Sequence, residues 1–280
     1  MSAIERDLEQ TAPHYAGSYK KLALVTGASS GIGRAFAQRL AGEGYNLIVV
    51  GRRGDRLDEL VAAFPQVSVR PLVADLATLA GIEAVSNVCH SEPLTLLVNN
   101  AGVAHYMPFI ELPVGKASEL LHVKVLATTL LTHAAMPGMV SRGGGSVINV
   151  AGMLAYSGSA TIENLPVRRA VYTSALAHIV AFTQTLHEEL KSQGLKIQAL
   201  CPGVVATEFH ERQGLDLSAV PRMSAEDVVT ASLNGLALGE VICAPGVEQY
   251  ELLSAVDKAS LAAFSAQSPT LAKRYNGQDE

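Results

Sequence analysis

Cysteine and charged residues are both scarce in this chain, and each shortage excludes a class of protein. The 280 residues include only three cysteines, Cys89, Cys201 and Cys243, which are widely spaced and form no CxxC pair. Such spacing suits neither a disulfide framework nor a zinc site, so we expect a metal-free protein of the reducing cytoplasm. Charged residues make up 17% of the chain and apolar residues 49%. This balance excludes a disordered chain and predicts a buried core.

Positive charge and long apolar runs are also lacking. The 21 Lys and Arg residues are outnumbered by 26 Asp and Glu residues, which gives a net charge of −5. Without a basic surface to hold a phosphate backbone, nucleic-acid binding is not expected. No uninterrupted apolar run approaches the ~20 residues of a membrane span, and the N-terminus carries acids without an apolar leader. We therefore expect a cytoplasmic protein that acts on a small molecule and binds no membrane.

Short apolar runs alternate with longer stretches of helical periodicity. This alternation is typical of strands buried on both faces and joined by crossover helices. It predicts an α/β fold with a seven-stranded parallel sheet and helices on both faces. The expected strands are Leu22–Thr26, Leu47–Gly51, Val67–Ala74, Leu94–Val98, Ser146–Val150, Lys196–Cys201 and Glu240–Ala244.

One domain with two tails accounts for the whole chain. We expect residues 1–20 to form a flexible polar tail, residues 21–265 the folded domain and residues 266–280 a C-terminal tail. Near the end of the domain, Ser224 and Asp227 form a capping box. This pairing satisfies end amides of a helix and predicts a helix start at this point.

A glycine-rich segment follows the first expected strand and opens a helix. It reads Thr26-Gly27-Ala28-Ser29-Ser30-Gly31-Ile32-Gly33. In a dinucleotide-binding loop, the first glycine permits a tight turn, the second lets backbone amides approach a pyrophosphate, and the third lets helix and strand pack closely. The helix N-terminus then faces the negative charge. The segment predicts a Rossmann-type dinucleotide site that includes Gly27, Ser29, Ser30, Gly31, Ile32 and Gly33.

Two arginines, Arg52 and Arg53, follow the second strand. A site for NAD usually has an acid here, which accepts the ribose hydroxyls. Arginine instead pairs with a 2′-phosphate. The alternative is a solvated loop, but the position favours NADP(H) as the cofactor.

With three further motifs, the chain resembles the short-chain dehydrogenase/reductase family from about Lys21 to Val247. Asp75-Leu76 resembles the pair that contacts adenine in the family. Asn99-Asn100-Ala101-Gly102 matches its NNAG motif, which implies that Asn99, Ala101 and Gly102 hold the sheet and line the ribose. The segment Pro202–Thr207 matches its PGxVxT turn, which implies cofactor contacts from Pro202, Gly203, Val205 and Thr207. The resemblance also implies self-association as a homodimer or homotetramer.

The resemblance fails at the catalytic tetrad, where the family uses Ser, Tyr, Asn and a Lys four residues after the Tyr. Tyr172 matches the tyrosine, but Leu176 stands at the lysine position and no YxxxK occurs in the chain. Gly152 stands at the serine position and Lys124 at the asparagine position. A phenol with no ammonium beside it keeps its proton near neutrality, so we expect Tyr172 to be a better proton donor than base.

Lys124 is a candidate replacement for the missing lysine. Its flexible stem can deliver an ammonium to the same space from the opposite wall of the site. The alternative is a lysine that faces solvent or a subunit interface. Leu176 can also be explained by packing alone, since it belongs to an apolar stripe at helical spacing.

Several side chains can replace the missing serine. Ser159 lies thirteen residues before Tyr172, the usual spacing in the family, and Tyr156 and Ser157 are close by. His105 follows the NNAG motif and can line the substrate cleft, where it would titrate near neutrality.

The residues favour an NADPH-dependent reductase of a carbonyl or imine-like small molecule. Tyr172, Lys124 or a loop hydroxyl such as Ser159 would supply the proton. Two alternatives stay open: a cofactor-binding pseudoenzyme with a regulatory role, and a non-redox lyase or isomerase in the same pocket. The substrate would be held by irregular segments, residues 152–172 and 208–222, which do not identify it.

Overall fold

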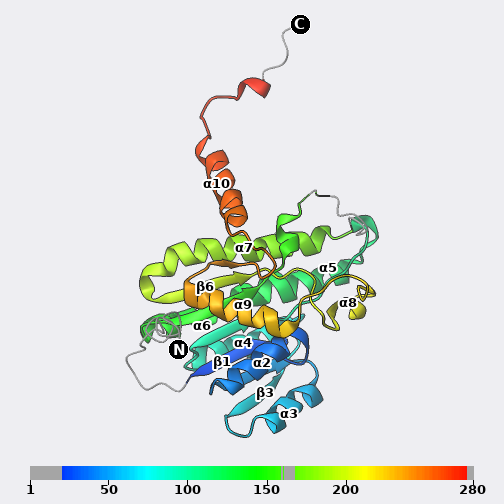
Figure 1. The fold of residues 1–280 in the computed structure, drawn as a ribbon, viewed down its shortest axis with the longest axis vertical. Helices are drawn as coiled ribbons and strands as arrows, with labels where there is room; N and C mark the ends of the chain where they lie inside the picture. Colours follow the sequence, from blue (N-terminus) through cyan, green and yellow to red (C-terminus); the bar gives the residue numbers. More distant parts are fainter. Residues whose placement is uncertain (1–20, 159, 161–167, 276–280) are drawn as a thin grey trace. The chain divides into compact units, whose positions relative to one another are not determined.

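The computed structural model describes residues 21–158, 160 and 168–275. Its centre is one seven-stranded sheet in the order β3-β2-β1-β4-β5-β6-β7, in which all neighbouring strands are parallel (Figure 1). The strands are β1 (Leu22–Thr26), β2 (Asn46–Gly51), β3 (Val69–Val73), β4 (Leu96–Asn99), β5 (Gly145–Val150), β6 (Leu195–Leu200) and β7 (Ile242–Cys243). The predicted seven-stranded parallel sheet is therefore confirmed.

The two edge strands differ from our expectation in different ways: β3 is less buried than expected, and β7 is shorter. In β3 none of the five residues is fully buried, and Pro71 lies in the middle of the strand. An edge strand tolerates proline because one side of its backbone needs no partner. The opposite edge, β7, has only two residues, and both are buried.

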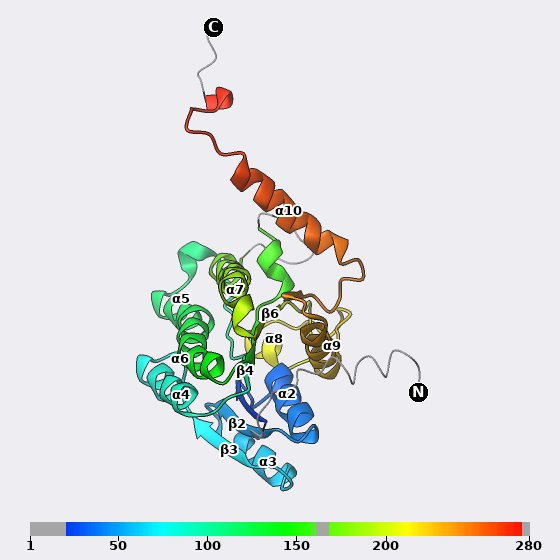
Figure 2. The same ribbon diagram turned by 90° about the vertical axis from the view of Figure 1, so that its left-hand side faces the viewer.

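Helices cover both faces of the sheet (Figure 2). One layer contains α2 (Gly31–Gly42), α3 (Gly54–Ala63) and α9 (Ala225–Leu238), whose apolar side chains share one core cluster with the strands. The other contains α4 (Leu79–Ser91), α6 (Ala127–Ser141) and α7 (Ala170–Leu190). Strand order reverses between β1 and β4, so the segments that follow these two strands lead in opposite directions and leave a crevice at their carboxyl ends.

The helix α5 (Val114–Leu121) continues into α6 through η2 (His122–Leu126), which is one π-helical turn. Such turns insert an extra residue and re-aim the side chains around them. Among the described residues, the stretch Val114–Ser141 is long and apolar enough to cross a membrane. Uninterrupted apolar runs in the sequence did not predict this stretch. Half of its most apolar window is buried, as in the core helix of a globular domain.

The described residues divide into two compact units, one that ends at Gly246 and one that begins at Val247. The helix α10 (Glu251–Ser265) belongs to the second unit. This division falls earlier than the boundary at residue 265 that we expected. The predicted N-terminal tail lies outside the described residues.

The predicted helix start at Ser224 is confirmed, but only the serine half of the capping box satisfies a helix-end amide. The Ser224 hydroxyl accepts a hydrogen bond from the Asp227 backbone amide at 3.0 Å and donates one to its carboxylate at 2.7 Å. At the other end, Gly239 has a φ of 81°, a left-handed conformation that favours glycine.

We expect Ser224→Ala to lower the free energy of unfolding by ~1 kcal/mol, because one helix-end amide loses its acceptor. Urea denaturation would measure the change. Ser174→Ala is the matched control: Ser174 is exposed on α7 and its hydroxyl bonds only within its own helix, to the Val171 carbonyl. Equal losses in the two variants would contradict the capping role.

Candidate active site

A cavity of about 930 Å³ lies at the carboxyl ends of the strands. Segments that follow six of the strands contribute to its walls, as expected at the crevice of an open parallel sheet. It brings together every predicted cofactor residue except Gly33 and Asn99. These are Gly27, Ser29, Ser30, Gly31, Ile32, Arg52, Arg53, Asp75, Leu76, Ala101, Gly102, Tyr172, Pro202, Gly203, Val205 and Thr207.

The glycine-rich loop depends on close approach and on positive φ angles. Gly27 has a φ of 67° and Gly31 a φ of 53°. Gly33 lies behind the cavity wall: a Cβ at this position would meet the Gly27 carbonyl oxygen and the Asn100 amide nitrogen, each at 2.4 Å. It therefore lets α2 pack against the end of β1, the role expected of the third glycine of the loop, and it does not itself line the cavity.

The first asparagine of the NNAG motif is also placed differently from our expectation. Asn99 is buried, and its amide donates to Thr132 Oγ1 and Asn149 Oδ1, both at 2.9 Å. These bonds tie β4 to β5 and α6, so Asn99 does not line the cavity. The residue that lines it is Asn100, whose amide donates to the Thr26 carbonyl at 2.9 Å. Sequence spacing did not distinguish the two, because both stand where a buried strand ends.

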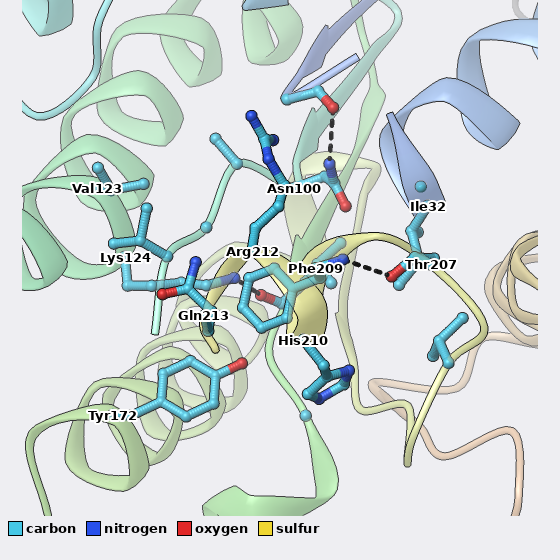
Figure 3. Close-up of a pocket in the computed structure, with 18 of the residues that line it drawn as sticks. Ile32, Asn100, Val123, Lys124, Tyr172, Thr207, Phe209, His210, Arg212 and Gln213 are labelled. Carbon is cyan, nitrogen blue, oxygen red and sulfur yellow. Dashed lines mark hydrogen bonds between the residues drawn. The ribbon is translucent and has the colours of Figure 1, made fainter. Parts of the chain in front are cut away.

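Lys124 faces the cavity and not solvent. It lies in the π-helical turn η2, is 4% exposed, and its ammonium donates to the Val150 carbonyl at 3.1 Å (Figure 3). A Cβ on Gly102 would lie 2.5 Å from Lys124 Cε, so the glycine makes room for this side chain. No carboxylate of the described residues forms an ion pair with Lys124, and burial lowers its pKa to about 8.

Tyr172 lies on α7 and lines the same cavity at 8% exposure. Burial raises the pKa of its phenol well above the ordinary value, and Tyr106 raises it further. The hydroxyl therefore carries its proton at neutral pH. This state suits a proton donor and disfavours the phenolate that alcohol oxidation requires.

Two residues without polar side chains, Gly152 and Leu176, stand at the serine and lysine positions of the tetrad, and both line the cavity. Leu176 is 1% exposed and lines the cavity, and Gly152 lies against it: a Cβ on Gly152 would contact Leu176 Cδ1 at 3.4 Å. Gly152 has a φ of 166°, an extended conformation open to any residue. Backbone strain therefore does not explain the absence of a serine at this position.

The hydroxyl candidates have different outcomes. Ser157 lines the cavity, but its hydroxyl donates to the Leu154 carbonyl at 2.8 Å and accepts from Arg169 at 3.3 Å. Its proton is thus already committed. Tyr156 does not line the cavity, and Ser159 lies outside the described residues.

His105 lines the cavity with a carboxylate partner. Its Nε2 lies 3.1 Å from Glu119 Oε2, and the other oxygen of that carboxylate is 3.8 Å from Arg52. The arrangement links the loop after β4 to α5 and to the end of β2.

Sequence reasoning missed an aromatic cluster at the substrate end, made of Tyr106, Tyr172, Phe209 and His210. The Tyr106 ring meets the Tyr172 ring edge-on with centroids 5.7 Å apart, and Phe209 lies 6.4 Å from Tyr172. His210 is 5.3 Å from Phe209, and burial, then Arg222, lowers its pKa. With only 5% aromatic residues in the chain, rings next to two site motifs were a signal that could have been used.

Comparison with known proteins assigns this geometry to a family. A family model described as short chain dehydrogenase matches residues 21–217. The chain belongs to the short-chain dehydrogenase family. A very-long-chain 3-oxoacyl-CoA reductase-like protein of Arabidopsis thaliana is 30% identical over 234 residues, 81% of this chain and 73% of that protein.

Two further relatives bear on the site of this short-chain dehydrogenase. An inactive hydroxysteroid dehydrogenase-like protein 1 of Pongo abelii is 31% identical over 68% of this chain and 58% of that protein. A solved short-chain dehydrogenase from Sphingobium yanoikuyae, in complex with NADPH, has a TM-score of 0.85 at 29% identity, covering 91% of this chain and 100% of that one. The chain is thus similar both to a protein described as inactive and to one that holds a nicotinamide cofactor.

We expect Gly33→Ala to weaken nicotinamide dinucleotide binding and to lower the free energy of unfolding by roughly 1–3 kcal/mol, because the new methyl overlaps the Gly27 carbonyl. Gly42→Ala is the control on the same helix, where a Cβ meets nothing within 4 Å. That variant should bind normally and gain up to ~1 kcal/mol. Calorimetric titration with the dinucleotide would measure binding in the two variants, and urea denaturation would measure their free energies of unfolding. Unchanged binding in Gly33→Ala would contradict the packing role.

Proposed function

We propose that this short-chain dehydrogenase is an NADP(H)-dependent reductase of a bulky, apolar carbonyl or imine-like compound. The observation that carries the proposal is that a buried ammonium, Lys124, and a protonated phenol, Tyr172, line the same cavity as the glycine-rich loop. In this proposal the tyrosine and lysine that the family places on one helix are replaced by groups from two separate helical segments.

The residues present fit the dinucleotide. Gly31 leaves room for its phosphates, since a Cβ at this position would lie 3.1 Å from Thr207 and narrow the cavity beside the loop. Backbone amides of the loop would hold the pyrophosphate. Arg52 and Arg53 would pair with a 2′-phosphate, which supports NADP(H) over NAD(H). When bound, the nicotinamide supplies hydride to the substrate carbon.

Tyr172 would donate a hydrogen bond, and then its proton, to the substrate oxygen or nitrogen. The proton transfer leaves a phenolate in a buried site, which is costly unless a positive charge lies near. Lys124 would supply such a charge from η2, where its ammonium donates to the Val150 carbonyl and forms no ion pair with a carboxylate of the described residues. Leu176 and Gly152 add apolar lining to the same cavity and would limit the access of water to the phenol.

The substrate end of the cavity favours apolar compounds. It is lined by the aromatic cluster and by Met153, Leu154, Leu215 and Leu217. Aromatic and aliphatic walls of this kind select a hydrophobic ligand, and the few polar groups orient it.

A cofactor-binding protein without redox activity is the second candidate. It is favoured by Leu176 and Gly152, which remove two groups of the usual tetrad, and by the relative described as inactive. NADPH consumption decides between the two candidates. Steady oxidation of NADPH with any member of a panel of bulky ketones, aldehydes and imines supports the reductase. Tight NADPH binding without turnover across the panel would overturn it in favour of the second candidate.

We expect Lys124→Met to reduce turnover on the order of a hundredfold, because the developing phenolate loses its nearby charge. The pKa of Lys124 is about 8, so the ammonium is present below that pH and lost above it. In the parent enzyme kcat/KM should therefore fall as pH rises through about 8, and Lys124→Met should lack this fall.

Lys191→Met, at an exposed residue that follows α7, is the control and should keep both the rate and the pH profile. Gly102→Ala offers a second route to the same test, since its methyl would displace the Lys124 ammonium without removing it. A parent-like rate and pH profile in Lys124→Met would exclude the relocated ammonium.

A further inference from the structure

Arg53 is held in place by two elements other than its own. Its guanidinium donates to the Ser29 hydroxyl at 3.0 Å and to Glu208 Oε1 at 2.9 Å. Ser29 belongs to the glycine-rich loop and Glu208 to the segment after β6, so one side chain joins three edges of the cavity. Arg52 is held more loosely, 3.8 Å from Glu119 and 52% exposed.

Glu208 is surrounded by the groups that would bind a phosphate. Besides Arg53, the carboxylate accepts from Arg212 at 3.2 Å and from the Ser30 hydroxyl. Burial raises the pKa of Glu208, but the hydrogen bonds from Arg53 and Ser30 and the charges of both arginines outweigh it and hold the pKa below the ordinary value. The residue is therefore an anion at neutral pH.

The Glu208 carboxylate and the 2′-phosphate of NADP(H) need the same hydrogen-bond donors. A 2′-phosphate is recognised by a guanidinium and by hydroxyl and amide donors of the loop beside it. Arg53, Ser29 and Ser30 are those donors here, and two of them already bind the Glu208 carboxylate. Glu208 is only one third exposed, so it is held against the cavity wall and does not extend into solvent.

We propose that Glu208 competes with the 2′-phosphate of the cofactor for Arg53 and so determines cofactor preference. If the cofactor is NADP(H), as in the proposed function on which this inference rests, the ion pair between Arg53 and Glu208 must break before the 2′-phosphate can bind Arg53. A dinucleotide without the 2′-phosphate leaves the pair closed. The Glu208 carboxylate therefore weakens the binding of NADP(H) but not that of NAD(H). The preference for NADP(H) over NAD(H) is then smaller than Arg52 and Arg53 would give without Glu208.

Glu208→Gln tests the competition, because it keeps the size of the side chain and removes its charge. We expect the Kd for NADPH to fall roughly three- to tenfold, the effect of a partly exposed ion pair. The Kd for NADH should stay within about twofold. Glu211→Gln is the control: it makes the same charge change one turn along on α8 (Phe209–Arg212), at an exposed residue that does not line the cavity.

Fluorescence titration with NADPH and with NADH would measure each Kd. An unchanged or higher Kd for NADPH in Glu208→Gln, or an equal gain for NADH, would overturn the inference. Arg53→Ala separates this failure from that of the proposed function. If the parent protein binds NADPH and Arg53→Ala weakens it, while Glu208→Gln changes nothing, only the competition is wrong. If the parent protein does not bind NADPH, the proposed function is wrong and the inference falls with it.

Discussion

The cavity lies where the ends of β1 and β4 are bonded to each other while the chain segments that follow the two strands lead in opposite directions. The Thr26 hydroxyl accepts the backbone amides of Asn100 and Ala101 at 2.9 and 3.0 Å. The Asn100 side chain returns a bond to the Thr26 carbonyl. This cluster fixes the glycine-rich loop against the NNAG segment, and Gly33 is needed because the same amide occupies the space of its Cβ. The positions of the glycine-rich loop and of the NNAG segment relative to each other follow from it.

A buried ammonium is costly, and this one has a single carbonyl acceptor among the described residues. Replacing Lys124 with an apolar residue of similar size would relieve that cost, so stability alone does not explain the lysine. The usual lysine position carries Leu176, which packs against Gly152 in the same cavity. Positive charge is thus present in the site, but it comes from the helix before β5 and not from the helix after it.

The sheet and the glycine-rich loop could be predicted because each depends on local sequence: buried apolar runs, glycine at tight turns and a helix directly after a strand. The inward direction of Lys124 could not, since it depends on the π-helical turn His122–Leu126, which no residue in that turn specifies. Asn99 and Asn100 could not be told apart, because alternation at the end of a strand decides which side chain is buried. The aromatic cluster combines Tyr106 with Phe209, more than a hundred residues away, and only the folded chain brings them together.

Glu208 and Phe209 are neighbours in sequence but serve opposite ends of the cavity. Glu208 bonds to Arg53 and Ser30. Phe209 lies near the Tyr172 ring, and both of these side chains are seen in Figure 3. Two adjacent residues share one peptide bond and cannot shift independently. If Glu208 determines cofactor preference as proposed, a change of backbone position at Glu208 would also move Phe209, so cofactor preference and substrate preference could not be engineered independently at this segment.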